Sequence, residues 1–280
     1  MIAATINDLI KRALAEDLGS GDHSSIACIP ANSRGKARLL IKETGIIAGI
    51  EIASYVFSHV DERISIHNNL DDGTSVKPGD TGFIVEGPVR GLLKSERLVL
   101  NIMQRMSGIA TTTGKYVNAV RGYKARILDT RKTTPGFRVL EKEAVRLGGG
   151  INHRMGLYDM IMLKDNHIDY AGGIVNAINK VNSYLEEKAL ELKIVIEVRS
   201  LDEVKQVLDT GRVDRIMLDN FSIADTKEAV GMIGGKYPVE SSGGINLRTI
   251  RSYAACGVDY ISVGALTHQL RSMDISLKAL

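Results

Sequence analysis

Cationic and hydrogen-bonding residues gather in the stretch from Ile127 to Ile168. This stretch contains the runs TRKTTPG at 130–136, GGG at 148–150, NHR at 152–154 and KDNH at 164–167. Each run comes at or just after a short apolar segment, so we expect its side chains where the scaffold ends and a loop begins, the usual place for chemistry. An arginine fork pairs with a carboxylate or a phosphate through two bonds. The stretch therefore favours a site for an anionic ligand over a solvated basic surface, and its cations are Arg131, Lys132, Arg154 and Lys164, with His153 and His167 beside them.

Two carboxylates come at later positions of the same kind. Glu197 is the last residue but one of an apolar run at 193–198, and Asp219 directly follows another at 215–218. Hard oxygen ligands that face one another suit Mg²⁺, which proteins bind mainly through substrate phosphates and water. Salt bridges to Lys132 and Lys164 are a compatible alternative, because the lysines can hold the carboxylates when the metal is absent. The sequence has no His-Cys cluster, which argues against zinc.

Glycines follow the last two apolar runs. They occur in Ser242-Gly243-Gly244 and in Ser262-Val263-Gly264, with His268 close by. Bare backbone N–H groups and a helix N-terminus accept anions at this point of many barrels. Glycines also serve tight turns between strand and helix, but two such turns in succession, with Ser and Thr nearby, favour a phosphate site.

The elements that position these residues alternate along the chain. Short apolar runs predict strands, and helical patterns lie between them, the first of which starts with Thr134 as cap and Pro135 at its first position and stops at Gly148. Alternation of this kind implies parallel strands joined by right-handed crossovers, with the active site at the carboxyl rim of a barrel or incomplete barrel. The strand candidates are 126–129, 159–164, 193–198, 215–218, 238–241 and 259–263.

The first 110 residues have a different pattern. An amphipathic helix is predicted at 5–16, a loop at 16–25, strands within 35–89 around a helix at 50–60, and a long helix at 95–122 that is interrupted near Gly108. The glycine-rich stretch 71–87 is similar to biotinyl and lipoyl carrier domains. Lys77 stands beside Pro78 without the flanking pattern of a carrier lysine, so we interpret the stretch as shared β architecture. Arg105 departs from the apolar stripe of the long helix, and spacing alone predicts a solvated face for it.

The totals exclude several classes of protein. The chain has 280 residues, 44% of them hydrophobic, and a net charge of only +3, which gives no argument for nucleic acid. Asn7, Asp8, Lys11 and Arg12 break up any signal-peptide core, and no apolar run approaches the length of a membrane span. With only two cysteines, far apart, we expect a soluble cytoplasmic protein in which both are small buried hydrophobes.

An aldolase that forms a Schiff base through Lys164 is a competing hypothesis. Against it, Arg131, Lys132, His153 and Arg154 supply more positive charge than a single aldehyde needs. A substrate with several negative charges accounts for them better.

The motifs resemble one family over essentially the whole chain, quinolinate phosphoribosyltransferase, also called nicotinate-nucleotide pyrophosphorylase (decarboxylating). The matching runs are EDLGSGDHSS (16–25), SERLVLNIMQRMSGIAT (95–111), TRKTTPG (130–136), GGGINHRMGLYDMIMLKDNHI (148–168), MLDN (217–220), SSGGI (241–245) and DYISVGALTH (259–268). The resemblance implies an α/β protein, with an N-terminal α/β sandwich-like domain at 1–110 and an incomplete (β/α) barrel at 111–280 whose C-terminal tail packs back on the first domain. It also implies a homodimer, or an assembly of dimers, in which the N-terminal domain covers the partner's barrel mouth.

The same resemblance implies a reaction and a set of roles. Quinolinate would react with 5-phosphoribosyl-1-pyrophosphate and Mg²⁺ to give nicotinate mononucleotide, pyrophosphate and CO₂, in de novo NAD biosynthesis. The implied quinolinate ligands are Arg131, His153 and Arg154, with Arg105 from the neighbouring subunit; Lys132 and Lys164 would act on carboxylate and pyrophosphate, Glu197 and Asp219 on ribose and Mg²⁺, and Ser242, Gly243, Gly244, Ser262, Gly264 and His268 on phosphate.

One departure from the family pattern concerns the run IVIEV, where Val195 replaces the first of two acids that many members carry and Arg199 follows where another acid is common. A related subgroup associated with molybdenum transport shares the fold, and a transferase for a different acid is therefore the alternative. The intact NHRMG and LKDNH runs favour the quinolinate enzyme.

Overall fold

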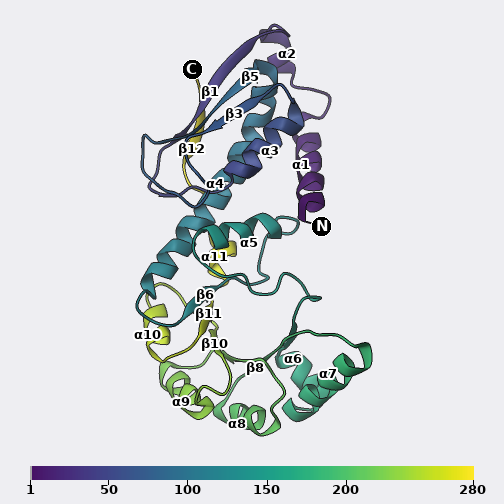
Figure 1. The fold of residues 1–280 in the computed structure, drawn as a ribbon, viewed down its shortest axis with the longest axis vertical. Coiled ribbons are helices and arrows are strands. Elements are labelled where there is room, and N and C mark those ends of the chain that lie inside the picture. The colour runs from purple at the N-terminus through teal and green to yellow at the C-terminus, as the bar shows by residue number, and fades with distance from the viewer. Residues whose placement is uncertain (1) are drawn as a thin grey trace. The chain divides into compact units, whose positions relative to one another are not determined.

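The computed structural model describes residues 2–280, and the chain divides into two compact units. The first unit comprises the residues up to Gly114 together with Thr133–Gly149 and Leu266–Leu280. The second comprises Lys115–Lys132 and Gly150–Ala265. Figure 1 shows both units, coloured along the chain. Each unit has its own sheet, because the first is built on antiparallel strands and the second on parallel ones.

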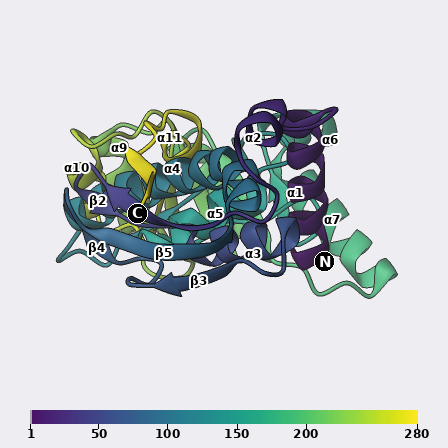
Figure 2. The same cartoon turned by 90° about the horizontal axis from the view of Figure 1, so that it is seen from above.

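The first unit is a four-stranded antiparallel sheet with the strand order β12-β1-β5-β3. Along β1 the residues Ala37, Leu39 and Ile41 are buried while their neighbours Lys36 and Arg38 are exposed, the alternation expected of a sheet with one face in the core. Figure 2 shows α4 on one side of β3 and β5. The bounds of the main elements are α1 Ile2–Leu18, α2 His23–Cys28, β1 Arg34–Ile41, α3 Ile50–Val60, β3 Ser65–Asn68, β5 Thr81–Pro88, α4 Val89–Ala119, α5 Arg138–Leu147 and β12 Ile275–Ala279, with a small ribbon of β2 Gly45–Ile46 and β4 Ser75–Val76.

The second unit is a six-stranded parallel sheet with the order β6-β11-β10-β9-β8-β7. The first strand of this unit, β6, pairs with its last strand, β11. Because β6 and β7 are at opposite ends of the strand order and do not pair, the unit is an incomplete (β/α) barrel with its opening between these two strands. Ile151 extends the β6 side of the opening through a parallel bridge to Leu128. The strands are β6 Arg126–Leu128, β7 Ile161–Leu163, β8 Ile194–Val198, β9 Arg215–Asp219, β10 Val239–Ser242 and β11 Tyr260–Ser262; the helices are α6 Asp165–Ala171, α7 Ile174–Lys188, α8 Leu201–Thr210, α9 Ile223–Ile233, α10 Ile250–Ala255 and α11 Ala265–His268.

The predicted α/β class and each of the barrel strands are therefore confirmed, while some element boundaries were wrong. Helix α4 runs through Gly108 without interruption. A Cβ there would meet the carbonyl of Arg271 and lie 3.2 Å from Ser272 Cα, so this glycine allows close backbone packing within the first unit.

Two further corrections concern helix starts. Helix α5 begins at Arg138 rather than at Pro135, because Phe137 N–H donates to the Thr134 carbonyl (3.0 Å) and Gly136 has a positive φ of 76°. Part of the predicted loop at 16–25 is helical, since α1 continues to Leu18 and α2 begins at His23, where the Asp22 side chain caps it by accepting from Ser25 N–H.

The two cysteines are free thiols, and the expectation that both are buried was wrong. Cys28 is exposed, and Cys256 is half-buried. Burial raises the pKa of the Cys256 thiol. No helix in the part of the chain that the structure describes has both the length and the apolar character to cross a membrane.

Candidate active site

The side chains at the ends of the barrel strands lie at one edge of the parallel sheet. Lys164 follows β7, Glu197 lies near the end of β8, and Asp219 ends β9. Ser242 ends β10 in register with Asp219, and Ser262 ends β11. Because parallel strands share one carboxyl edge, this arrangement gathers the polar groups that the sequence distributes over a hundred residues.

Lys164 and Glu197 form an ion pair at this edge. The Lys164 ammonium lies 3.0 Å from Glu197 Oε2, and the Glu197 side chain is only 7% exposed whereas that of Lys164 is 48% exposed. The lysine therefore stabilises a nearly buried carboxylate while its own charge stays accessible. A Schiff-base lysine works from an apolar pocket, so this pairing speaks against an aldolase.

Asp219 is followed by a turn that two backbone conformations define. Asn220 has a positive φ of 55°, its N–H donates to the Ser242 carbonyl (2.9 Å), and its side-chain amide donates to Asp219 Oδ2 (2.7 Å). Gly243 lies directly against Asn220 with a φ of +96°, and a Cβ there would be 2.8 Å from the Asn220 nitrogen. The glycine at 243 thus allows the β10 exit to approach the β9 exit, which positions Asp219.

The two turns proposed to bind phosphate differ in their surroundings. Gly244 has a φ of +60° and an exposed position with open space around its Cα. The Ser262 hydroxyl is buried and donates to the Ser241 carbonyl at 3.5 Å. Gly264 is half-buried and is followed by the short α11, in which His268 is exposed.

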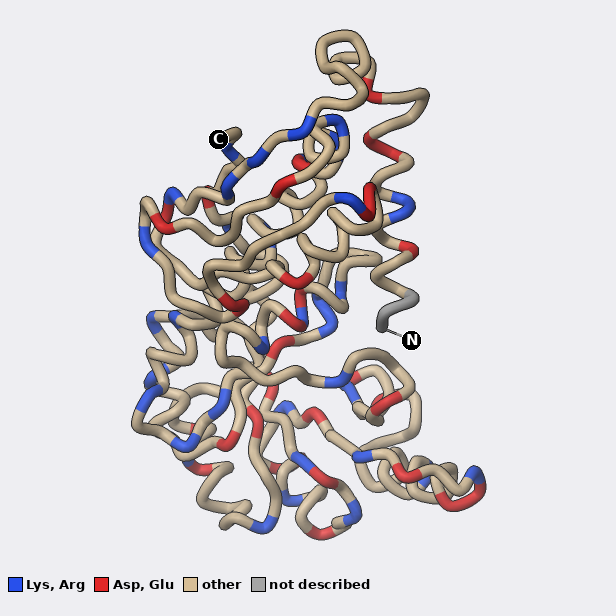
Figure 3. Tube along the Cα trace, turned by 45° about the horizontal axis from the view of Figure 1, so that its top comes forward, with Lys and Arg blue, Asp and Glu red and all other residues tan. Residues whose placement is uncertain are grey.

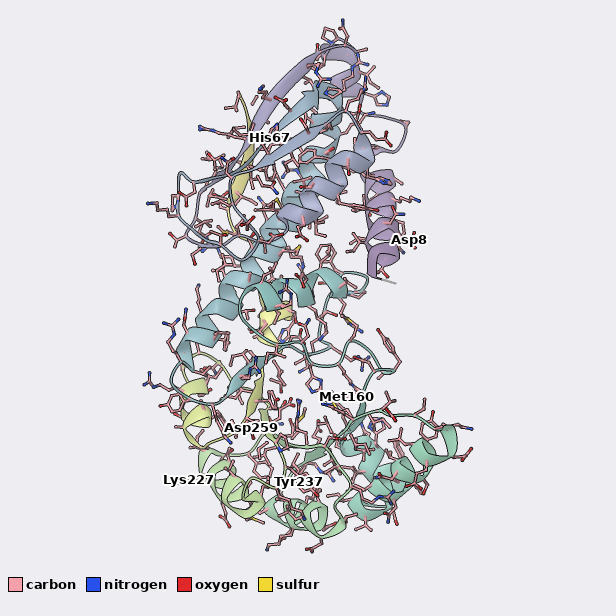
Figure 4. The ribbon with its side chains drawn as sticks, in the orientation of Figure 1. Asp8, His67, Met160, Lys227, Tyr237 and Asp259 are labelled. Atoms are coloured by element: carbon pink, nitrogen blue, oxygen red, sulfur yellow. The ribbon has the colours of Figure 1, made fainter. Side chains whose placement is uncertain are left out.

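The Asn-His-Arg run lies at the opening of the barrel, directly after the bridge at Ile151. His153 and Arg154 are 8% and 7% exposed. The fully buried Asp129 accepts from His153 N–H (2.8 Å), and His153 Nδ1 accepts from Arg154 N–H (2.7 Å). The Arg154 guanidinium donates through Nη1 to the carbonyl of Met160 (3.0 Å), which lies directly before β7 and is labelled in Figure 4. Backbone and side-chain bonds thus fix this segment at the rim.

Arg154 is an almost buried cation whose charge no carboxylate of the described residues neutralises by an ion pair. Burial, followed by the positive charge of Arg131, lowers the pKa of Arg154, and the negative charge of Asp159 opposes this only in part. Arg131 and Lys132 are exposed at the end of β6. Figure 3 shows basic and acidic residues interspersed along the trace, so this positive focus is local. An anion bound beside Arg154 would offset both the cost of burying its charge and the repulsion from Arg131.

Arg105 belongs to the first unit, and its predicted solvated position was wrong. Its Nε and Nη2 both donate to Glu141 Oε1 (2.8 and 2.5 Å), and Nη2 also donates to Thr134 Oγ1 (2.6 Å). The Arg105 side chain is 29% exposed, and Glu141 is fully buried. Glu141 accepts from Thr134 N–H through its other oxygen (3.1 Å), so it ties Arg105 to the TTPG turn.

Sequence reasoning missed several buried charges that contact the predicted site residues. Glu240 lies within β10, its carboxylate 3.4 Å from His153 Nε2 and 2.8 Å from Arg215 Nη1. Asp129 and Glu141 were missed as well. The available signal was an acid inside an apolar run, as in PVES, but its partners lie far away in the chain.

The carboxylates at the rim do not form a metal site by themselves. Among the residues that the structure describes, no group of three or more His, Cys, Asp or Glu could hold a metal ion. A divalent cation at Glu197 and Asp219 would need most of its ligands from a bound substrate and from water, as Mg²⁺ commonly does.

Comparisons with known proteins agree over both units. The family model described as "Quinolinate phosphoribosyl transferase, N-terminal domain" matches residues 22–107, and the corresponding C-terminal domain model matches residues 109–278. A nicotinate-nucleotide pyrophosphorylase (carboxylating) of Arabidopsis thaliana, named as chloroplastic, is 45% identical over 96% of this chain and 81% of its own length. The protein of that name from Mycobacterium leprae is 42% identical over 96% of this chain and 95% of its own length.

Solved structures give the same result. NadC from Streptococcus pyogenes has a TM-score of 0.93 and 40% identity, covering 98% of this chain and 97% of that one. The nicotinate-nucleotide pyrophosphorylase of Francisella tularensis has a TM-score of 0.93 and 38% identity, covering 99% and 96%. The two domain models of one family together match residues 22–107 and 109–278, and the relatives and solved structures agree with them. The chain therefore belongs to the quinolinate phosphoribosyltransferase family.

Proposed function

We propose that this chain transfers the phosphoribosyl group of 5-phosphoribosyl-1-pyrophosphate to quinolinate, releasing pyrophosphate and CO₂ and giving nicotinate mononucleotide for NAD biosynthesis. The observation that carries the proposal is the buried guanidinium of Arg154, which faces the charge of Arg131 and lacks an ion-paired carboxylate among the described residues. A dicarboxylic acid supplies the missing negative charge. The name of a Nicotiana tabacum relative, quinolinate phosphoribosyltransferase (decarboxylating), which is 43% identical over 98% of this chain, supports this substrate.

Quinolinate would bind at the barrel opening, and Arg131, His153 and Arg154 would bind its two carboxylates. Loss of the 2-carboxylate from the pyridinium adduct leaves an electron pair next to the ring N⁺, which stabilises it, and a proton then takes that position. The protein has to orient the acid and to desolvate the leaving carboxylate. The low exposure of His153 and Arg154 suits both tasks.

The phosphoribosyl donor would lie across the strand ends. Glu197 and Asp219 would accept from the ribose hydroxyls, and Lys132 and Lys164 would stabilise the negative charge that develops as pyrophosphate leaves C1. The Lys164 side chain supports this role, because Glu197 holds its ammonium at 3.0 Å while 48% of the side chain stays exposed. The phosphate ligands in this proposal are Ser242, Gly243, Gly244, Ser262, Gly264 and His268.

Mg²⁺ fits the donor set at the rim. Glu197 and Asp219 offer hard oxygen ligands, and an ion bound there would take most of its ligands from the substrate and from water. When bound, Mg²⁺ would neutralise charge on the pyrophosphate. In its absence the Lys164 ammonium offsets the charge of Glu197.

We further infer a homodimer in which Arg105 serves the active site of the partner subunit. Two of its nitrogens are fixed by Glu141 and Thr134, and no described residue accepts from Nη1, which leaves that group available for a carboxylate. A cytoplasmic location is proposed from the free cysteines, although the Arabidopsis relative is named as chloroplastic. Fractionation of the source cells would test the location.

The first experiment measures product directly. Purified protein with quinolinate, phosphoribosyl pyrophosphate and Mg²⁺ should yield nicotinate mononucleotide and equimolar CO₂. Arg154→Ala should lower kcat/KM for quinolinate by about 10²-fold or more, because it removes a buried charge partner. The matched control is Arg121→Ala, which should act like wild type, because the Arg121 side chain is exposed and donates a hydrogen bond to Asn118 Oδ1 at the end of the preceding helix. A folded wild-type protein that forms no product would refute the assignment.

Mixing two inactive variants tests the shared site. Arg105→Ala and Arg154→Ala would each fail alone, but a mixed dimer would contain one intact site, restoring roughly a quarter of wild-type activity after random exchange of subunits. No recovery from a verified mixed dimer would place Arg105 in the site of its own chain.

A further inference from the structure

Three titratable side chains lie together inside the barrel unit, where that of Glu240 contacts those of Arg215 and His153. Glu240 is fully buried, and its place in β10 is in register with Met217 of β9 and Tyr260 of β11. A buried carboxylate is costly unless it is paired and hydrogen-bonded. Here Oε2 accepts from Arg215 Nη1 at 2.8 Å and lies 3.4 Å from His153 Nε2, while Oε1 has no hydrogen-bond partner among the described residues.

Arg215 is itself held in place. It starts β9, at the end of the strand away from the rim, and its side chain is 16% exposed. Its guanidinium lies over the ring of Tyr260, with Cζ 4.1 Å from the ring centroid. Ring and carboxylate together fix the guanidinium. Burial raises the pKa of the Glu240 carboxyl, but His153 and Arg215 outweigh burial, and the net pKa lies below its ordinary value.

The hydrogen bonds of His153 define one tautomer. Since Nδ1 accepts from the backbone N–H of Arg154 (2.7 Å), the ring proton belongs on Nε2, the nitrogen that faces Glu240. Asp129 holds the backbone N–H of His153 from the other side (2.8 Å). The segment that carries Arg154 therefore rests on two buried carboxylates, of which Glu240 acts through the imidazole.

We propose that Glu240, fixed by Arg215, is a positioning residue for the carboxylate-binding site: it holds the orientation of the His153 imidazole and thereby the placement of Arg154. This inference rests on the proposed function for its kinetic consequence. In the proposed binding mode Glu240 contacts neither substrate. Its effect should appear in quinolinate binding and not in binding of the phosphoribosyl donor, whose ligands lie at the strand ends.

The variants separate positioning from folding. Glu240→Gln keeps an acceptor for His153 Nε2–H but loses the ion pair with Arg215. Glu240→Leu removes both and leaves the Arg215 guanidinium buried, so it also threatens folding. The double variant Glu240→Leu/Arg215→Leu replaces the pair by apolar groups, a change that buried ion pairs often tolerate.

The expected results differ by substrate. In the double variant KM for quinolinate should rise by roughly 10-fold or more, since a group that orients a binding histidine has been lost. KM for the phosphoribosyl donor should stay within about twofold. Glu240→Gln should fall between this variant and wild type. A folded double variant with wild-type KM for quinolinate, or with both KM values raised equally, would overturn the proposal.

Nitrogen NMR of the His153 ring gives a readout without substrate. The wild type should show the Nε2–H tautomer with its Nε2–H proton shifted downfield by the Glu240 carboxylate, and the double variant should keep the tautomer, which Arg154 N–H fixes, but lose that shift. A wild-type ring protonated on Nδ1 would overturn the inference even if the enzyme is active. A wild type that shows Nε2–H but does not react with quinolinate would refute the proposed function and leave the positioning of His153 supported.

Discussion

Replacing Gly243 by alanine should damage the strand-end site, because both the backbone conformation and the space at this position exclude a side chain. Its φ of +96° is a conformation that L residues rarely adopt, which costs about 1–2 kcal/mol. The added Cβ would also lie 2.6 Å from Asn220 Cγ and 2.8 Å from Asn220 N. Because the backbone nitrogen belongs to the turn after β9, it cannot rotate away, and overpacking of this kind costs about 1–3 kcal/mol.

The free energy of unfolding should therefore fall by about 2–5 kcal/mol in Gly243→Ala. Gly235→Ala is the matched control, because Gly235 has a φ of +79° in the same unit and no atom within 4 Å of an added Cβ. It should lose only about 1–2 kcal/mol. Urea unfolding measures both values, with the slope checked for a change in the exposed surface.

Activity should respond in the same order. Movement of Asn220 shifts Asp219, which its side-chain amide contacts at 2.7 Å, so kcat/KM for the phosphoribosyl donor should fall by about 10²-fold in Gly243→Ala. Gly235→Ala should keep wild-type kinetics. Equal losses of stability in the two variants, or wild-type activity in Gly243→Ala, would refute the argument that close packing at this turn positions the carboxylate.

Three further predictions concern charge. Glu141→Gln should cost about 1–3 kcal/mol in urea unfolding, since it leaves Arg105 with a neutral partner in a buried setting; an unchanged midpoint would contradict the ion pair. The hydrogen bonds of Arg63 lower the pKa of Asp61 to about 2 from 3.8, so the stability from this pair is complete above pH 3.8 and is lost as the pH falls through about 2. NMR titration should show the pKa of Asp61 return toward 3.8 in Arg63→Ala, and an unmoved value would assign the shift to another group. Removal of Mg²⁺ by EDTA should abolish activity without changing the thermal unfolding temperature, and added Mg²⁺ should restore it; unfolding on chelation would indicate a structural metal instead.

The barrel strands were predictable because burial on both faces makes each one a continuous apolar run. The polar ends of those runs were predictable for the same reason, since a polar residue cannot continue a buried strand and so marks its exit. Lys164, Asp219 and Ser242 are all found in this way. Helix boundaries were less predictable: Pro135 suits a first helical turn, but Gly136 adopts a positive φ and delays α5.

Long-range pairing could not be read from local patterns. Arg105 departs from an apolar stripe, and nothing near it in the chain indicates Glu141, which is 36 residues away. Glu240 illustrates the same limit, because an acid within PVES gives no hint that its partners come from β9 and from the loop after Ile151. A charged residue within an apolar run indicates that a charge is buried, but it does not identify the partner that stabilises it. That partner is defined only by the fold.

The edge strand β12 has a consequence for how the protein is made. It pairs with β1 along the register from Ala37↔Ala279 to Ile41↔Ile275, although about 240 residues separate the two strands in the chain. At a translation rate of roughly 5–20 residues per second, β1 waits on the order of 10–50 s for its neighbour to emerge from the ribosome. During that time its hydrogen-bonding edge is open to other nascent chains, an aggregation hazard that its exposed residues Arg34, Lys36 and Arg38 counteract by charge repulsion. The barrel can form within this interval, so the first unit would be the last to fold.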